Sequence, residues 1–393
     1  MDTIYLDNNA TTRPTPGVMD AVAEGLRDGW QNPSSVHRGG QEARARVELA
    51  RQAIADLIGA RARDITFTGS GTESIDLAIR GVLGAGRTTL ITDRAEHNAV
   101  RDLAEALEAS GTDVRWAPID GRGVVDPEGV RALLADLGSS AIVSVQWANN
   151  ETGAVQPIEA IGAVCREAGA VFHCDGTQWI GKEPVNVKDP PPFDLLSFSP
   201  HKFHGPKGVG VLWRARGVRL RPVVHGTQEL GARGGTENTP GLLGAGAAAR
   251  EAAAWLADDH ARARLRAERD RLERGVIDAC AAFGLTVAIN GDGAEDGRLW
   301  NTTNLGFPRL EAEALLLLLS ERGLEASAGA ACSSGSLDPS PVLLAMGIAP
   351  ETAHGSVRLS LSRETTPEEI DRALEIIPEA VQRLAGSMAR LGS

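Results

Sequence analysis

Short apolar strands alternate with amphipathic helical stretches in the first half of the chain, and this alternation limits the possible folds more than any other feature. Between residues 60 and 215, segments such as TTLITD (88–93) and VFHCDG (171–176) have the length and β-branched content of buried strands. Helical stretches such as HNAVRDLAEALEASG (97–111) separate them. Strands that alternate with helices predict βαβ units and a mostly parallel sheet flanked by helices. The sequence therefore predicts an α/β fold.

The second half of the 393-residue chain has a different composition, which indicates a second domain. Residues 236–284 are rich in Ala, Arg and Leu and predict long helices that leave the first domain. Strand-like WNTTNLGF and SVRLSLS and helical EAEALLLLLSERG follow. We predict a large α/β domain over residues 16–260 and a smaller α+β domain formed by residues 1–15 and 261–393.

Composition argues against several classes of protein. The formal net charge of −12 disfavours a nucleic-acid surface, which needs clustered Lys and Arg. The longest apolar run, ALLLLLS (314–320), is too short to span a membrane, and the N-terminus does not read as a signal peptide. The cysteines are widely spaced without a metal-binding pattern, so we expect no metal site and reduced thiols in the cytoplasm. They are Cys165, Cys174, Cys280 and Cys332.

Polar residues follow four of the predicted strands, in TGSGTES (68–74), NNETG (149–153), DGTQ (175–178) and SPHK (199–202). Ligands of such sheets bind outside the carboxyl ends of the strands, so these segments predict one site. In the first segment, Gly71 and Thr72 open a helix, where free N–H groups and the helix dipole favour an anion such as phosphate. A capped helix start without a ligand explains this segment equally well.

Asp175 directly follows an apolar strand, where a buried carboxylate needs a cationic partner. The protonated ring nitrogen of pyridoxal phosphate is such a partner, although an Asp here can also simply cap a turn. Lys202, in a strand-end loop beside His201 and His204, would meet cationic neighbours that favour a neutral, nucleophilic amine. Of the other lysines, Lys207 shares this loop, whereas Lys182 and Lys188 lie in GKEPVNVKDPP, which we expect to be a surface connection.

Cys332 stands in ASAGAACSSGSLDPSP (326–341), a segment of small residues poorly suited to forming a core. A lone cysteine is often just a small buried hydrophobe. The flanking Ala, Gly and Ser residues instead favour a backbone with high conformational freedom. The residues alone leave both interpretations open.

Ten segments together resemble the cysteine desulfurases, which belong to the class V aminotransferase group of fold-type I pyridoxal phosphate enzymes. The resemblance covers essentially the whole chain. The segments are YLDNNATT, NPSSVHRGG, FTGSGTESIDLAIRG, EHNAV, ANNETGAVQPI, HCDGTQ, SPHKFHGPKGVGVL, GARGGTENTPGLLGA, CSSGSLDPSPVLLAMG and VRLSLSRETTPEEID.

The resemblance assigns roles around a pyridoxal 5'-phosphate cofactor. Lys202 would carry the cofactor as an aldimine and move protons, and His97 would stack on the ring and assist as an acid–base group. Asp175 would hold the pyridine nitrogen. Asn150 and Gln178 would lie near the ring hydroxyl and the substrate.

The resemblance also implies a phosphate site completed by a second subunit. Gly71, Thr72, Ser199 and His201 would bind the phosphate, and Thr236 would reach in from the partner of a homodimer. We also expect Arg233, in the same segment as Thr236, to contact a ligand.

The implied reaction converts L-cysteine to L-alanine and leaves a persulfide on Cys332, which passes sulfur to an acceptor protein. Arg358 would bind the substrate carboxylate, with Asn32 in the same pocket. The acceptor would be a scaffold or thiolation enzyme, in iron–sulfur cluster assembly or in thiolation.

Two segments, AGAAC (328–332) and DGTQW (175–179), depart from the usual family pattern. Alternatives within the group are a selenocysteine lyase, an aminotransferase or a sulfide-releasing C–S lyase, and outside it a non-enzymatic phosphate-binding protein.

Overall fold

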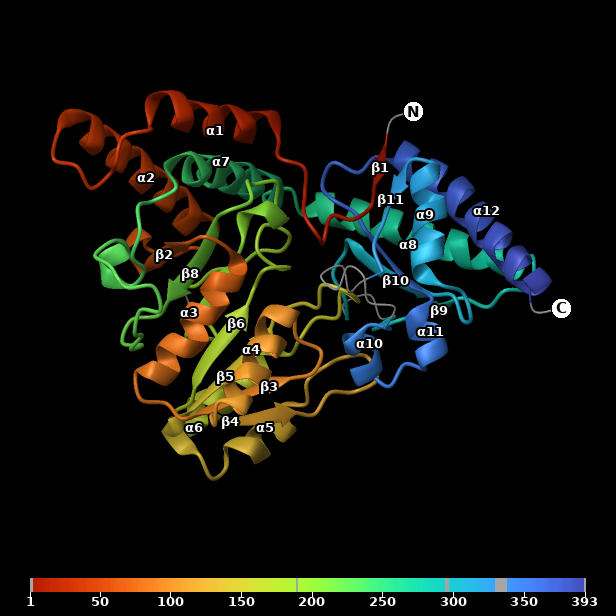
Figure 1. The fold of residues 1–393 in the computed structure, drawn as a ribbon, viewed down its shortest axis with the longest axis horizontal. Coiled ribbons are helices and arrows are strands. Elements are labelled where there is room, and N and C mark those ends of the chain that lie inside the picture. Colours follow the sequence, from red (N-terminus) through yellow and green to blue (C-terminus); the bar gives the residue numbers. More distant parts are fainter. Residues whose placement is uncertain (1–2, 189, 294–296, 329–337, 392–393) are drawn as a thin grey trace.

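The computed structural model describes residues 3–188, 190–293, 297–328 and 338–391. Figure 1 shows two lobes: a large one built on a long twisted sheet, and a smaller one that contains the blue C-terminal elements together with the red N-terminal strand. The N-terminal segment crosses from the small lobe to the large one, and the chain returns to the small lobe near residue 259.

The large lobe contains a seven-stranded sheet, in which neighbouring strands are parallel except where β8 pairs in antiparallel fashion with β2 and with β7. This confirms the predicted, mostly parallel sheet. The alternation of strands and helices gives little signal for β4, because it lies at the sheet edge and begins with an exposed residue, Asp113. The spatial order is β2 (Ile65–Thr68), β8 (Gly210–Arg214), β7 (Leu195–Phe198), β6 (Val171–Asp175), β5 (Ala141–Gln146), β3 (Thr89–Asp93), β4 (Asp113–Ala117).

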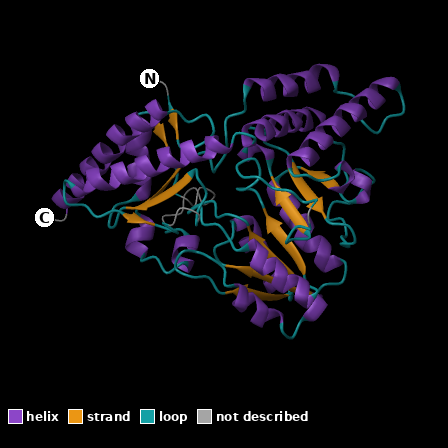
Figure 2. Cartoon of the chain, turned by 180° about the vertical axis from the view of Figure 1, so that it is seen from behind, coloured by secondary structure: helices purple, strands orange, loops and turns teal. Residues whose placement is uncertain are grey.

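Helices cover both faces of this sheet (Figure 2). One face packs against α3 (Gly71–Gly84) and α4 (Asn98–Ala109), and the other forms the larger core with the remaining helices of the lobe. Those helices are α1 (Pro16–Asp28), α2 (Arg38–Leu57), α5 (Pro127–Leu134), α6 (Ile158–Ala168) and α7 (Thr239–Leu256), with 3-10 turns η1 (Ala62–Asp64), η2 (Gly138–Ser140), η3 (Pro200–Lys202) and η4 (Glu229–Gly231).

The small lobe has its own hydrophobic core, drawn from Ile4, Leu6 and residues between 265 and 381. The N-terminal strand belongs to it because β1 pairs in parallel with β11. The two cores divide close to residues 15 and 260, and the domain boundaries themselves stay predictions. The elements are β1 (Ile4–Tyr5), α8 (Asp259–Ala281), β9 (Ala288–Ile289), β10 (Thr302–Gly306), α9 (Ala312–Glu321), β11 (Leu324–Glu325), α10 (Pro341–Ala345), α11 (Pro350–His354), β12 (Ser356–Ser360) and α12 (Pro367–Leu391).

Within the described ranges, no helix is long and apolar enough to cross a membrane. Among the same residues, no three His, Cys, Asp or Glu side chains gather in a group that could hold a metal ion.

Candidate active site

A cavity of about 240 Å³ opens at the carboxyl ends of the parallel strands, where the strand-end motifs predicted a site. It brings together most of the residues predicted from the sequence. Its lining comprises Ala10, Ser70, Gly71, Thr72, Ile75, His97, Ala99, Gln146, Ala148, Asn150, Asp175, Thr177, Gln178, Ser199, His201 and Lys202.

The first turn of α3 forms one wall of the cavity. Ser70 is the N-cap, and its Oγ accepts from the N–H of Glu73 at 3.1 Å. The helix begins at Gly71, where an added Cβ would lie 3.3 Å from the Cβ of Ser199, so a larger residue would crowd this part of the cavity wall. Arg233, which we expect to contact a ligand, also has a partner within the chain, because its Nε lies 2.7 Å from Oε1 of Glu73.

Asp175 ends β6 at the floor of the cavity and is almost fully buried. Its Oδ1 accepts from the N–H of Thr177 at 2.9 Å. Burial raises the pKa of this carboxyl, while hydrogen bonds from Thr177 and the charge of Lys202 act in the opposite direction. A bound cationic N–H would therefore stabilise the ionised form of Asp175.

Lys202 lies in η3, directly after β7. Its Nζ donates to the carbonyl oxygens of Asn9 at 2.6 Å and Ala10 at 2.8 Å. These contacts come from the N-terminal segment, which closes one side of the cavity. Lys207, the other lysine of this loop, is exposed and does not line the cavity.

The histidines near the cavity are neutral at physiological pH. Burial, with nearby Lys202 and two arginines, lowers the pKa of His97 to about 4. Its Nδ1 caps α4 by accepting from the N–H of Ala99 at 3.1 Å, which leaves Nε2 as the N–H donor. Burial also lowers the pKa of His201 to about 3 and that of His204 to about 4. The expectation that these two histidines are cationic neighbours of Lys202 is therefore wrong, because burial keeps both uncharged.

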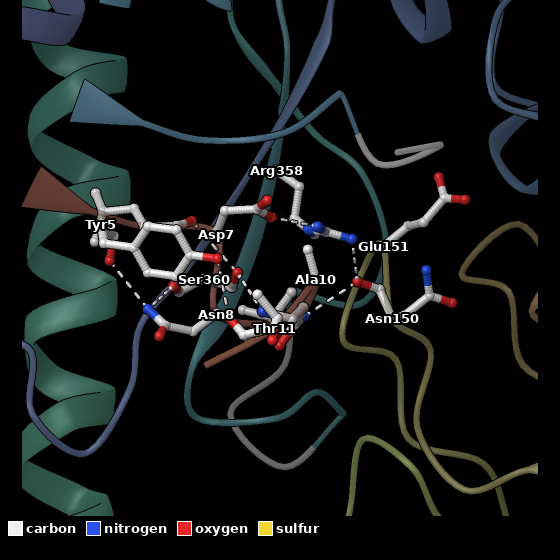
Figure 3. Close-up of polar contacts among 12 residues, drawn as sticks. Tyr5, Asp7, Asn8, Ala10, Thr11, Asn150, Glu151, Arg358 and Ser360 are labelled. Carbon is white, nitrogen blue, oxygen red and sulfur yellow. Dashed lines mark hydrogen bonds and ion pairs between the residues drawn. The ribbon is translucent and has the colours of Figure 1, made fainter. Parts of the chain in front are cut away.

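Arg358 lies in the middle of β12 and is only 1% exposed, so it is not a surface charge of this strand. Its guanidinium donates to the carbonyl oxygen of Asn150 at 3.0 Å and pairs with Oδ1 of Asp7 at 2.5 Å (Figure 3). Arg358 thus connects the small lobe to a loop that lines the cavity.

Two residues that the sequence analysis missed or misplaced lie behind the cavity. Lys182, expected in a surface connection, is buried, and its Nζ donates to Gln178 Oε1 at 2.6 Å and Asn9 Oδ1 at 2.8 Å. Asn9 is fully buried and its carbonyl also accepts from Gln178 Nε2 at 3.0 Å. The scarcity of lysine in the chain was the only signal that could have drawn attention to Lys182.

Two other predicted residues lie outside the cavity of this chain. Asn32, between α1 and α2, is exposed, and its Oδ1 accepts from the N–H of Ser34 at 2.8 Å. Thr236, in the loop before α7, is exposed as well. Cys332 lies outside the described residues.

The three described cysteines are all buried. Burial raises the pKa of Cys165 to about 12, that of Cys280 to about 11, and that of Cys174 well above its usual value. Because the thiolate is the nucleophile, none of these three thiols is activated.

Comparison with known proteins places the chain in a family. The model for "Aminotransferase class-V" matches residues 4–373. The chain belongs to this family. Among its relatives, "Cysteine desulfurase" of Trichormus azollae is 45% identical and "Cysteine desulfurase NifS" of Azotobacter vinelandii is 43% identical, each alignment covering 98% of this chain and 94% of the relative.

Solved structures agree with this assignment. A "NIFS-LIKE PROTEIN" superposes with a TM-score of 0.88 at 34% identity, covering 97% of this chain and 100% of the other. The structure titled "SspA in complex with cysteine" superposes with a TM-score of 0.76 at 31% identity, covering 93% and 100%. The fold-type I assignment made from the sequence is confirmed.

Proposed function

We propose that this chain is a pyridoxal phosphate-dependent cysteine desulfurase that converts L-cysteine to L-alanine and stores the sulfur as a persulfide on Cys332. One observation carries the proposal: the amine of Lys202, the carboxylate of Asp175 and the start of α3 all line one small cavity. The cysteine desulfurase relatives and the neighbour solved with cysteine support the same substrate.

The cavity fits the chemistry of the cofactor. A lysine amine suits its aldehyde carbon, a buried carboxylate suits its ring N–H, and the unpaired N–H groups of a helix start suit its phosphate. In the described part of the chain, Asn150 Oδ1 is buried without a hydrogen-bond partner. This oxygen of the cavity wall can therefore accept a hydrogen bond from a bound molecule. Pyridoxal phosphate, when bound, withdraws electrons from the Cα of an amino acid.

The chain's own groups would bind the substrate and move its protons. Lys202 Nζ would remove the Cα proton, because the carbonyls of Asn9 and Ala10 stabilise its protonated form. His97, neutral with its N–H on Nε2, would donate a hydrogen bond from Nε2 without adding positive charge to the cavity. Arg358 would hold the substrate carboxylate with its planar guanidinium.

The sulfur step requires a thiolate that can approach the substrate. The Cys332 thiolate would attack Sγ of L-cysteine, so that a sulfur–sulfur bond forms, the carbon–sulfur bond breaks, and the carbon takes a proton to give L-alanine. The net reaction of one thiol and L-cysteine to one persulfide and L-alanine is balanced without an external oxidant.

The described residues on either side of Cys332 support its role. Ser327 and Arg358 exchange backbone hydrogen bonds, with N···O distances of 3.3 and 2.7 Å. Ser340 Oγ donates to the carboxylate of Glu151 at 2.6 Å, next to Asn150 in the cavity wall. Ser327 and Ser340, described residues on either side of Cys332, thus both contact residues beside the cavity.

We also propose a homodimer that completes the phosphate site. Large apolar side chains are exposed around Asn32: Leu26 (63%), Trp30 (71%) and Val36 (92%). Exposed apolar surface of this kind marks protein interfaces, and Thr236 would act from the partner subunit. The sulfur acceptor would be a scaffold or thiolation protein that meets Cys332 in the cytoplasm.

Two experiments test the chemistry. Borohydride reduction followed by peptide mapping should place the pyridoxyl group on Lys202, and finding it on Lys207 would overturn the assignment.

Alanine release and persulfide labelling are then compared for Cys332→Ala and Cys174→Ala. The first variant should lose both activities while it still binds the cofactor, and the second should keep them. The opposite pattern would refute the role of Cys332, whereas an aminotransferase would not need this thiol.

A further inference from the structure

We propose that Lys182 is a positioning residue that fixes the side-chain amide of Gln178 and, through Asn9, the peptide that holds Lys202. The inference rests on the proposed function, because it assigns Lys182 a role toward the bound cofactor. Lys182 does not line the cavity, so it acts through the two residues that it contacts.

Local structure directs Lys182 inward. Gly181 adopts φ +80°, and a Cβ at this position would lie 2.5 Å from the Cβ of Phe203, so the turn requires glycine. The turn leaves Lys182 only 5% exposed, and its carbonyl accepts from Trp300 Nε1 at 3.1 Å. In the described part of the chain, no carboxylate lies within ion-pair distance of its amine, which is unusual for a buried lysine.

The amine of Lys182 decides which way the amide of Gln178 faces. Nζ donates to Oε1 of Gln178 at 2.6 Å, so the amide must direct Nε2 to the other side, where it donates to the carbonyl of Asn9 at 3.0 Å. Burial and the nearby charges of Lys202 and Arg358 lower the pKa of Lys182 well below its usual value. A neutral amine still carries two N–H donors, enough for both oxygens. The orientation of Gln178 therefore does not depend on the charge of Lys182.

Asn9 links this arrangement to Lys202. Its Oδ1 accepts from Lys182 Nζ at 2.8 Å and from Asn301 Nδ2 at 3.0 Å. Its carbonyl oxygen accepts from Lys202 Nζ at 2.6 Å. Without Lys182, Oε1 of Gln178 would lose its donor, and only the contact of Nε2 with the Asn9 carbonyl would oppose a rotation of the amide that presents an acceptor to the cavity. An acceptor there would repel the ring oxygen of the cofactor that Gln178 is expected to face.

The test compares Lys182→Met with Lys188→Met, which removes the exposed lysine of the same connection. We expect Lys182→Met to bind pyridoxal phosphate roughly tenfold more weakly, the effect of one buried hydrogen bond. With the cofactor fully bound, the apparent pKa of the visible absorption band should shift by about one unit, because the free energy of one hydrogen bond also acts on the ring oxygen. Lys188→Met should match the wild type in both measurements. Equal behaviour of the two variants would overturn the proposal.

A double variant tests whether Lys182 acts through Gln178. If it does, adding Lys182→Met to Gln178→Leu should change the affinity and the titration less than Lys182→Met does alone, because only the route through Asn9 remains. Full additivity would contradict the mechanism.

Melting temperatures of the cofactor-free proteins separate positioning from general destabilisation. If Lys182→Met does not fold, Lys182→Gln replaces it in the test. The shorter Gln side chain cannot reach both oxygens, so the apparent pKa of the absorption band must still shift. A wild-type titration of Lys182→Gln would refute the positioning role. Failure of the proposed function is recognised separately, because the wild-type protein would then take up no pyridoxal phosphate at all.

Discussion

The cavity and the corner formed by the α1–α2 connection and the loop before α7 differ in how completely one chain builds them. At the cavity, Lys202 and Asp175 are held by neighbours from the same chain. At the corner, the predicted ligands Asn32 and Thr236 are exposed beside exposed apolar side chains such as Trp30. Under the proposed function, one chain prepares the site for the cofactor ring, and a second copy would complete the site where the predicted ligands face solvent.

The largest expected effect comes from the cavity. Asp175→Asn keeps the size of the side chain but removes the charge that would hold a ring N–H. We expect alanine release to fall roughly 10²–10³-fold, the range for loss of one preorganised electrostatic contact. Steady-state kinetics at full cofactor loading measure it, and an unchanged melting temperature controls for folding. Activity within a few-fold of wild type would show that Asp175 only caps its turn.

The next effect comes from the corner. Trp30→Glu places a charge on the proposed interface and should raise the dimer dissociation constant about 30-fold or more, as loss of an interface hot spot does. Sedimentation analysis with activity measured against protein concentration checks this. Leu317→Glu, at an exposed leucine of α9, is the matched control and should stay dimeric. A wild-type protein that is fully active as a monomer would contradict the proposed interface and, with it, the difference between the two regions.

A smaller effect separates binding from assembly at the corner. Thr236→Val should weaken pyridoxal phosphate binding about tenfold, because a hydrogen bond to a charged phosphate is lost, while the mass in solution stays that of a dimer. Thr227→Val, in the same loop, is the control. Affinity is measured by cofactor titration, and equal affinities in the two variants would place Thr236 outside the phosphate site.

The last effect, which is confined to acidic pH, is the pH dependence of stability at His97. Its pKa is about 4 in the folded protein against 6.5 for a free histidine. Between these values the unfolded chain binds more protons, so the stability that His97 contributes is present above pH 6.5 and is lost as the pH falls toward 4. The stability of the cofactor-free protein relative to His97→Gln should decline by at most about 1.4 kcal/mol per pH unit across this window. Denaturant unfolding at several pH values measures it, and a difference that does not change with pH would show that His97 titrates normally.

Much of the fold could be predicted from local patterns. The buried strands of the central sheet and the helices after them carry their own periodicity, and the run from 236 to 284 forms α7 and α8 as expected. The pattern failed at β4, because an edge strand is only partly buried and its alternation is weak. The strand-end motifs predicted one site because parallel strands place their carboxyl ends at the same edge.

The fold class, the sheet edge that carries the cavity and the residue types gathered there follow from the sequence alone, because they depend on periodicity and chain direction. Tertiary structure alone decided that Lys182 is buried, that His201 and His204 are uncharged, and that Arg233 pairs with Glu73. The physical reason is that burial and hydrogen bonding depend on neighbours distant in the chain. Asn9 meets Lys182 and Asn301 only after both lobes have folded, and no local pattern records such contacts.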